Sequence, residues 1–323
     1  GDLEKAVIGE IEKLRYENQQ FSPDQNISWY LLERGFAKKA WLDQGGHQEA
    51  VWEYDEACEG KEPKVVSFYS FKGGMGRTTA LAATAILLAK QGKSVLMVDT
   101  DIEAPGVADI FFDQTTVQHG TVDFFVNYQA LANYQADMQQ YILEVTDATL
   151  KEDLSGELYV IPAGKTDESY LSKLARIDYQ DMIPDGMRDT VTRLMKDAVK
   201  FLKEHGKAID YVLLDARAGF HDLGGVVTFQ IPHGIVLVGR NNEQSWTGIK
   251  EAVTLAGTAQ KDLVPIVLVD SMCGVISSLA TEQRDLFKKR AYTLCCNLYY
   301  PNEQQPGPDA EDEAHTPVYI PYR

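Results

Sequence analysis

The stretch SFKGGMGRTT, residues 70–79, decides the fold. It follows an apolar run that predicts a buried strand over 65–70, and it precedes an alanine- and leucine-rich run that predicts a helix over 78–91. A glycine-rich turn between a buried strand and a helix directs backbone N–H groups toward a bound anion. The sequence therefore predicts a loop that cradles phosphate groups.

This loop departs from the usual pattern at one position. The common pattern is G-x-x-x-x-G-K-[ST], but Arg77 stands where that pattern has lysine, and Lys72 precedes the glycines. Arginine keeps the charge but is larger and planar, so we expect binding to survive and turnover to depend on its placement. Thr78 would put its hydroxyl on Mg²⁺. The close approach of the backbone is allowed by three glycines, Gly73, Gly74 and Gly76.

Downstream of the loop, buried apolar runs alternate with helical patterns. Continuous apolar strands separated by helices are typical of a parallel sheet that is covered on both faces. The sequence therefore predicts an α/β fold, a doubly wound, mostly parallel sheet with helices on both faces, and a ligand beyond the carboxyl ends of its strands. Further strands are predicted at 94–99, 157–162, 211–215, 234–239, 264–269 and 317–320, a helix at 187–205, and a polar, mobile loop at 301–315.

Carboxylates follow two of these strands. Asp99 and Asp101 come at the end of one, and Asp215 ends another. Carboxylates at strand ends beside a phosphate loop can hold magnesium through water and orient an attacking water. A structural alternative is that each aspartate caps the turn or helix that follows it. Because all three are expected at the same edge of the sheet, we favour the magnesium site.

Composition limits the possible functions. The chain has 323 residues and a net charge of −17, which argues against sequence-independent binding to nucleic acid. No apolar run reaches the roughly 18–20 residues of a membrane span. Four cysteines without a C-x-x-C pair are expected to be the reduced thiols of a cytoplasmic protein. The scattered histidines indicate no zinc site.

Residues 1–62 differ from the remainder and are predicted to form a small helical extension to the alternating strand–helix domain at 63–323. Apolar residues recur at helical spacing over 2–19, and SPDQ at 22–25 predicts the start of a second helix. This segment carries three of the four tryptophans, which must pack on something. Two interpretations remain open: docking on the chain's own main domain, or a surface for a partner. The three are Trp29, Trp41 and Trp52.

The motifs together resemble the ParA and MinD group of P-loop ATPases, the deviant-Walker-A class of the SIMIBI division. The early lysine of K-G-G-x-G-K-[ST] is Lys72, D-x-D is Asp99 and Asp101, and D-x-x-x-G is Asp215 with Gly219. The chain is most similar to a bacterial subgroup with K-G-G-x-G-R-[ST]. The subgroup's other motifs are present as DTDIEAPG at 99–106, IPAG at 161–164 and NEQ at 242–244.

The resemblance implies a role for each matching residue. Lys72 would reach the partner's phosphates across an ATP-bound homodimer, and Arg77 would act with it on the phosphates. Asp101 would position the attacking water, and Asp99 and Asp215 would lie in the outer magnesium shell. The remaining loop contacts to ATP would come from Gly73, Gly74, Met75, Gly76, Thr78 and Thr79.

The resemblance also assigns the segments around the phosphates. Residues 217–225 would be the second switch, which senses the γ-phosphate. Adenine would lie against the loops after the last strands, at Asp270, Ser271 and Pro321. The cofactors implied are therefore ATP and Mg²⁺.

Three functions remain open at this point. The leading one is an ATP-hydrolysing dimerisation switch, the module of a larger bacterial signalling or defence-type protein with an unknown partner or effector domain. The second is an ATP-binding sensor or scaffold with little hydrolysis, which Arg77 keeps open. The third is a DNA- or cargo-positioning ATPase, which the acidity disfavours. The ending TPVYIPYR shows no amphipathic membrane helix, and we expect the native protein to continue beyond it.

Overall fold

The computed structural model describes residue 41 and residues 62–322, except for 114, 132, 178–185, 259–263, 275–277 and 302. Residues 36–323 make up one compact unit, so Trp41 belongs with the sheet. The helices predicted at 2–19 and after 22–25 lie outside the described residues, as do Trp29 and Trp52. The proposed domain boundary at residue 62 therefore stays a prediction.

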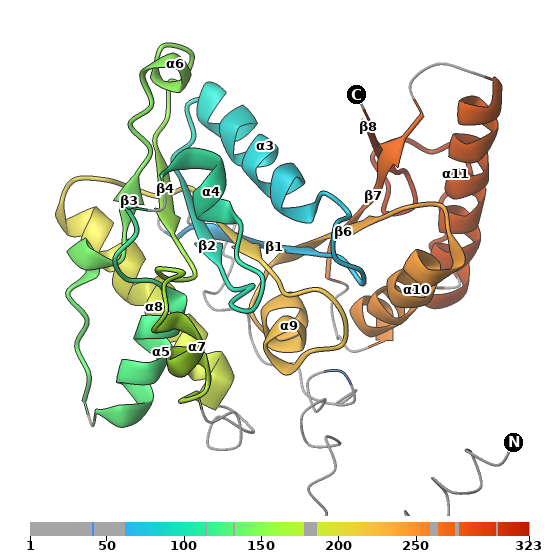
Figure 1. The fold of residues 1–323 in the computed structure, drawn as a ribbon. Coiled ribbons are helices and arrows are strands. Elements are labelled where there is room, and N and C mark those ends of the chain that lie inside the picture. The colour runs from blue at the N-terminus through green and yellow to red at the C-terminus, as the bar shows by residue number, and fades with distance from the viewer. Residues whose placement is uncertain are drawn as a thin grey trace, which may run out of the picture. The chain divides into compact units, whose positions relative to one another are not determined.

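The described part of the chain contains one sheet of eight strands (Figure 1). Their order is β3-β4-β2-β5-β1-β6-β7-β8, and every pairing is parallel except that of β3 with β4. The predicted doubly wound, mostly parallel sheet is thus confirmed. The strands are β1 (Lys64–Tyr69), β2 (Val95–Asp99), β3 (Leu143–Glu144), β4 (Leu158–Ile161), β5 (Tyr211–Asp215), β6 (Gly234–Gly239), β7 (Ile266–Cys273) and β8 (Val318–Pro321).

Most predicted strands lie within one or two residues of the observed ones, but β7 differs. The prediction ended this strand at 269, whereas β7 continues to Cys273. Its polar last residues pair with β8, and the register shifts between Ser271 and Cys273. An apolar pattern does not reveal a strand end held by pairing to a neighbour, so the prediction stopped too early.

Helices cover both faces of the sheet (Figure 1). On one face, α3 and α4 pack on apolar strand residues, and on the other face α5, α8, α10 and α11 do so. The helices are α3 (Arg77–Lys90), α4 (Val107–Phe111), α5 (Thr121–Ala130), α6 (Ala148–Lys151), α7 (Tyr170–Leu174), α8 (Gly186–Glu204), α9 (Asp222–Gly225), α10 (Glu243–Thr258) and α11 (Ser278–Leu298), with the 3₁₀ turn η3 (Met138–Gln140) and the π-helical turn η4 (Val226–Gln230).

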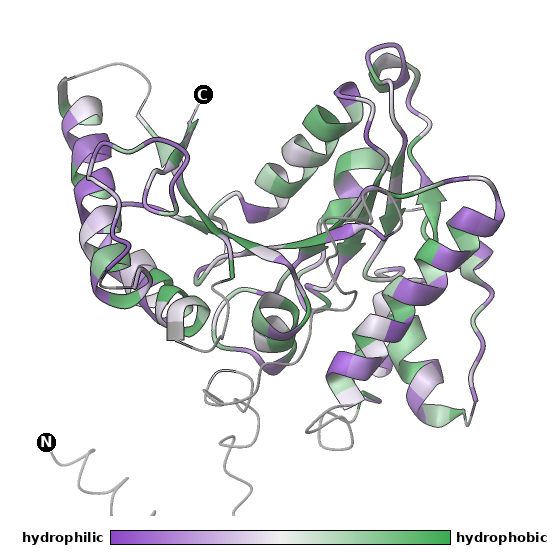
Figure 2. Cartoon of the chain, turned by 180° about the vertical axis from the view of Figure 1, so that it is seen from behind, coloured by the Kyte–Doolittle hydropathy of each residue, from purple (hydrophilic) through white to green (hydrophobic). Residues whose placement is uncertain are grey.

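Successive side chains of a strand point to opposite faces of the sheet, which explains why both faces have an apolar core. In β1, Val65 and Tyr69 join the core on the α8 side, whereas Phe68 joins the core under α3. Because both faces are covered, the strands read as continuous apolar runs. Figure 2 shows them as the most hydrophobic part of the fold, with polar outer surfaces on α8 and α11.

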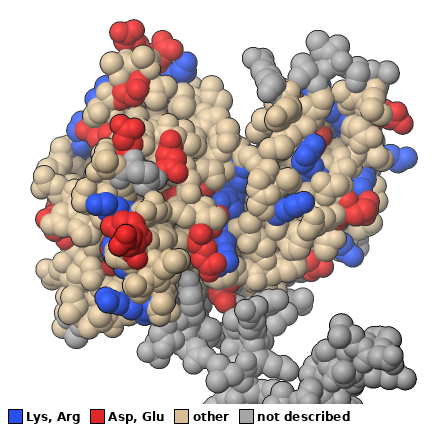
Figure 3. Space-filling view, viewed as in Figure 1, with Lys and Arg blue, Asp and Glu red and all other residues tan. Residues whose placement is uncertain are grey.

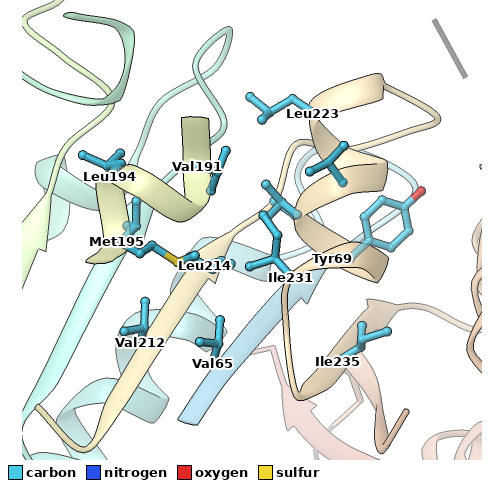
Figure 4. Packing of buried hydrophobic residues seen from close by; sticks show 14 of the residues in the cluster. Val65, Tyr69, Val191, Leu194, Met195, Val212, Leu214, Leu223, Ile231 and Ile235 are labelled. Atoms are coloured by element: carbon cyan, nitrogen blue, oxygen red, sulfur yellow. The ribbon is translucent and has the colours of Figure 1, made fainter. Parts of the chain in front are cut away.

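Helix α8 shows how the amphipathic prediction works in space. Its residues Val191, Leu194 and Met195 point toward Val212 and Leu214 of β5 (Figure 4). These side chains are fully buried, and each buried aliphatic side chain contributes about 1.5–3 kcal/mol. The packing fixes β5, and with it the position of Asp215 at the carboxyl end of the strand.

The acidic segment 301–315 has neither helix nor strand among its described residues, as predicted for a loop. It is nevertheless attached to α11. Lys288 lies 3.1 Å from Asp309, and the Gln305 side chain donates to the Cys296 carbonyl. Among the described helices, none combines the length and apolar character needed to cross a membrane.

The IPAG segment generates a test of the fold, because it packs against Gly120 before α5. A Cβ at Gly120 would lie 2.2 Å from the Pro162 carbonyl oxygen and 2.4 Å from the Gly164 nitrogen. We therefore expect Gly120→Ala to lower the free energy of unfolding by at least about 2 kcal/mol, since backbone must move. Chemical denaturation of both proteins would measure the difference.

Gly307→Ala is the matched control, because no atom lies within 4 Å of a Cβ built at Gly307. It should leave stability within about 0.5 kcal/mol of wild type. Equal stabilities for the two variants would show that the IPAG segment does not pack as described.

Candidate functional site

The loop between β1 and α3 has the backbone that its glycines predict. Gly74 and Gly76 have φ angles of 73° and 75°, in the left-handed region. The Ser70 hydroxyl donates to the Lys72 carbonyl at 3.0 Å, and the Ser271 hydroxyl from β7 donates to the Met75 carbonyl at 2.6 Å. These bonds hold the loop in shape without using its outward N–H groups.

The loop is open on the side where an anion would bind. A Cβ at Gly73 or Gly74 would have no neighbour within 4 Å. Gly76 precedes α3 without a side-chain cap, and the first turn of α3 contains no acidic residue. The first N–H groups of a helix lack partners and attract anions. The open cradle therefore fits the phosphate groups of a nucleotide.

Arg77 points inward from this cradle to the carboxylates. Its Nε donates to Asp215 Oδ1 at 2.5 Å, and its terminal nitrogen donates to Asp101 Oδ2 at 2.7 Å. The Thr78 hydroxyl donates to the other Asp215 oxygen at 2.7 Å. Residues from three predicted motifs thus meet beneath the loop, at the carboxyl ends of β2 and β5. They are Arg77 and Thr78 of the loop, Asp101 and Asp215.

The electrostatics of this cluster follow from its burial. The side chains of Arg77 and Asp101 are each 7% exposed, and that of Asp215 is 1% exposed. Burial lowers the pKa of Arg77, but Asp215 and Asp101 outweigh it, so the net pKa is raised and Arg77 stays charged. Burial also raises the pKa of Asp215, while Arg77 and Thr78 oppose that rise. Arg77 is thus the counter-charge that Asp101 and Asp215 share inside the protein.

The carboxylate of Asp99 binds backbone N–H groups of the loop that follows β2. Its carboxylate is buried and accepts backbone bonds from the N–H groups of Asp101, Gly106 and Val107, each at 3.0 Å. Burial, followed by the charge of Asp215, raises its pKa to about 7. This is the capping arrangement weighed as the alternative: Asp99 shapes the loop after β2 and begins α4. Its assignment to the magnesium shell stays a prediction.

The residues present fit Mg²⁺ rather than a metal held by protein alone. In the described ranges, no group of three or more His, Cys, Asp or Glu could hold a metal ion. Mg²⁺ usually keeps several waters and takes one or two protein ligands plus phosphate oxygens. Thr78 and Asp215, already in contact below the loop, are the pair that would hold it.

The remaining predicted loop residues divide by exposure. Lys72, in the loop, and Thr79, in the first turn of α3, have exposed side chains. The Met75 side chain is buried, 7% exposed, against the Ser245 hydroxyl. Met75 therefore contributes only its backbone to the cradle.

The three residues predicted for adenine lie on the neighbouring strands β7 and β8. Ser271 is buried and bonded to the loop, so its hydroxyl positions Met75. Asp270 is 3% exposed, and its burial raises its pKa to about 6 against the charges of Arg240 and Arg284. Pro321 is exposed at the end of β8. Their contact with adenine stays a prediction.

One functional contact was missed by the sequence reasoning. Arg217, in the predicted second switch, binds both carboxylate oxygens of Glu103, in the loop after β2. The Thr100 hydroxyl also donates to the Asp215 carbonyl at 2.7 Å. The two loops that flank the phosphate cradle are therefore joined. Glu103 belongs to the motif DTDIEAPG, and Arg217 belongs to the segment after Asp215. The spacing of these motifs in the sequence does not show that the two residues meet.

The chain is similar to known proteins over part of its length. Residues 63–220 match the family model described as an AAA domain. The chain is 27% identical over 157 residues to an uncharacterized ATP-binding protein of Methanocaldococcus jannaschii, covering 49% of this chain and 46% of that protein. It is 35% identical over 101 residues to the arsenical pump-driving ATPase of Escherichia coli, covering 28% and 17%. The matched region thus spans less than half the length of these curated relatives.

The cell division ATPase MinD of Pyrococcus furiosus superposes with a TM-score of 0.45 at 19% identity, covering 68% of this chain and 78% of that one.

The buried ion pairs generate a prediction that is independent of ligand binding. Removing the charge in Arg77→Ala leaves Asp101 and Asp215 without their shared counter-charge. We expect the free energy of unfolding of the ligand-free protein to fall by about 3 kcal/mol at neutral pH. Denaturant unfolding would measure it, with Lys72→Ala as the control, because Lys72 is a cation on the same loop but is exposed. Equal stability of the two variants would contradict the inward placement of Arg77.

Proposed function

We propose that this chain is a P-loop ATPase of the ParA/MinD type, which binds ATP with Mg²⁺ and hydrolyses it as a nucleotide-dependent dimerisation switch; the match of residues 63–220 to an AAA domain supports the proposal. One observation carries the proposal. An open, uncapped phosphate cradle lies directly above Thr78, Asp101 and Asp215; buried Arg77 bridges the two carboxylates, and the Thr78 hydroxyl donates to Asp215. Such a combination of anion cradle and carboxylates suits phosphoryl transfer to water.

In the hydrolysis of ATP, the protein forms no covalent bond to the substrate. In hydrolysis, water forms a bond to the γ-phosphorus, the bond from that phosphorus to the bridging oxygen breaks, and ADP and phosphate result. Catalysis of this transfer is mostly positioning and charge stabilisation. Bound Mg²⁺ would supply positive charge to the phosphate oxygens, held by Thr78 and Asp215. Asp101 would orient the attacking water, and the loop N–H groups would fix the phosphates.

Arg77 has two roles in this proposal. Without nucleotide it supplies the counter-charge of Asp101 and Asp215 and holds both in place, as their short bonds indicate. With nucleotide, its guanidinium gives up at least one carboxylate to contact a phosphate oxygen. Since the pairs are buried, this exchange costs free energy that phosphate contacts must offset. The site should therefore select strongly for a ligand with the charge of a triphosphate.

Lys72 supports the dimerisation part of the proposal. It is exposed beside the glycines, whereas Arg77 is occupied below them. A cation free to extend outward suits phosphates bound by a second copy of the chain. ATP would then bind the dimer better than the monomer, as any such switch requires.

The ion pairs of Arg77 also favour the second candidate, an ATP-binding sensor or scaffold with little hydrolysis. If Arg77 stays on Asp101, that carboxylate is not available to water. Turnover distinguishes the candidates. The acidity of the chain, net charge −17, counts against a DNA-positioning role. We further propose a cytoplasmic module of a larger signalling or defence-type protein with its own effector partner. Among the described residues, Cys273, Cys295 and Cys296 are free thiols.

Asp101→Asn tests the hydrolytic proposal. The amide oxygen can still accept from Arg77, but the group can no longer act on water as a carboxylate. We expect steady-state turnover of Mg·ATP to fall at least about 100-fold, with the Kd for ATP within about threefold of wild type. Phosphate release and calorimetric titration would measure the two quantities. Unchanged turnover would assign the hydrolysis to another residue or to a contaminant. Wild-type turnover at the level of Asp101→Asn, with ATP bound, would establish the sensor.

Lys72→Ala tests the dimer. Losing a cation that reaches the partner's phosphates should abolish ATP-dependent dimerisation and lower turnover at least about 100-fold. Light scattering after size exclusion, with a non-hydrolysable ATP analogue and with ADP, would measure the mass. Lys90→Ala is the matched control, an exposed lysine at the far end of α3, and should dimerise normally. A dimer of Lys72→Ala as stable as wild type would refute this role.

A further inference from the structure

The side chain of Trp41 packs against the predicted second switch, residues 217–225, although Trp41 is far from it in sequence. Its side chain is 8% exposed, and its indole Nε1 donates to the carbonyl of His221 at 2.8 Å. The ring makes edge contacts with Phe220 at 4.9 Å and Phe229 at 5.1 Å, and a tilted contact with Tyr69 at 5.4 Å. Trp41 is separated by 180 residues from the backbone group that it binds.

The partners of Trp41 differ in how firmly they are fixed. Tyr69 ends β1 in the core, and Figure 4 shows it beside the turns of α9 and η4. Phe229 belongs to η4. Phe220 and His221 instead follow Gly219, whose φ of 77° needs glycine, and come before α9. Two of the residues that contact Trp41, Tyr69 and Phe229, therefore belong to regular structure. The other two, Phe220 and His221, belong to the loop that is expected to respond to phosphate.

Aromatic contacts also connect this site to the phosphate loop. Phe220 lies 4.9 Å from Phe71, which directly precedes Lys72. Phe71 is seated against Gly248 of α10, where a Cβ would lie 2.0 Å from Phe71 Cβ. The Gly219 N–H donates to the Ser70 carbonyl at 3.3 Å. A movement of the phosphate loop or of residues 219–221 must therefore change the surroundings of Trp41.

We infer that the second switch holds the Trp41 side chain while no ATP is bound, and that ATP releases Trp41 from it. The inference rests on the proposed function, since it requires residues 217–225 to respond to the γ-phosphate. In the ligand-free state Trp41 closes over Phe220 and the His221 carbonyl. In the ATP state Phe220 and His221 follow Gly219, and Trp41 loses its hydrogen bond and part of its aromatic enclosure.

This coupling is reciprocal. By linkage, a protein that captures the released Trp41 would raise the affinity of the chain for ATP. Trp41 would thus carry the output of the switch without being part of its catalytic machinery. A permanent structural contact is the alternative, in which Trp41 stays buried in every nucleotide state.

Fluorescence of a protein with Trp41 as its sole tryptophan separates these alternatives. The variant carries Trp29→Phe, Trp52→Phe and Trp246→Phe. Without nucleotide, and with ADP, we expect emission typical of a buried indole and weak quenching by acrylamide. With a non-hydrolysable ATP analogue and Mg²⁺, the emission should shift to longer wavelength and the quenching constant should rise at least twofold. ATP binding is measured in parallel by calorimetry.

The outcomes are distinct. Bound ATP analogue with an unchanged or blue-shifted signal would overturn the inference and leave the proposed function standing. No binding of ATP would instead remove the proposed function on which the inference rests.

Two matched substitutions test the coupling in the protein with its other tryptophans intact. Trp41→Phe removes the bond to His221, and Trp246→Phe removes a similar indole bond to Asn241, made within an aromatic and cationic cluster of α10 and α11. We expect Trp41→Phe to raise affinity for the ATP analogue relative to ADP at least threefold. Trp246→Phe should leave that ratio unchanged. Equal ratios in both variants would make the Trp41 contact merely structural.

Discussion

The bonds of one buried guanidinium determine how the rest of the site is built. Arg77 joins Asp101 at the end of β2 to Asp215 at the end of β5. Burying two carboxylates at that depth is costly without a counter-charge, and Arg77 supplies it. The large core around β5, packed by α8 on one face and α3 on the other, holds the two strand ends close enough for one side chain to bridge them.

The loops around this centre are linked to each other as well as to it. Asp99 shapes the loop after β2 through three backbone bonds, and Arg217 ties that loop to the one after β5 through Glu103. Ser271 ties the phosphate loop to β7. Such connections favour a site that changes between discrete arrangements, because one loop cannot move far without the others. Charges of both signs are interspersed on the face shown in Figure 3, so the acidity of the chain is spread over this surface.

The sequence predicted the sheet and the cradle because both depend on local pattern. Buried strands at 65–70 and 211–215 and the glycines of the loop follow from hydrophobic runs and backbone geometry. The inward direction of Arg77 could not be predicted, since the motif fixes where the residue is but not which group it contacts. Asp99 accepts backbone bonds in the turn after β2, which the motif did not indicate, and its place beside magnesium stays a prediction. The Trp41 and Arg217 contacts join residues far apart in sequence, and no spacing rule indicates them.

The most direct test of the account is a structure of the protein with Mg²⁺ and a non-hydrolysable ATP analogue. The account predicts phosphates in the loop at 72–79, the Arg77 guanidinium within hydrogen-bond distance of a phosphate oxygen, and the Thr78 hydroxyl turned from Asp215 to the metal. A nucleotide bound elsewhere, or one bound in the loop with both carboxylate bonds of Arg77 intact, would contradict it.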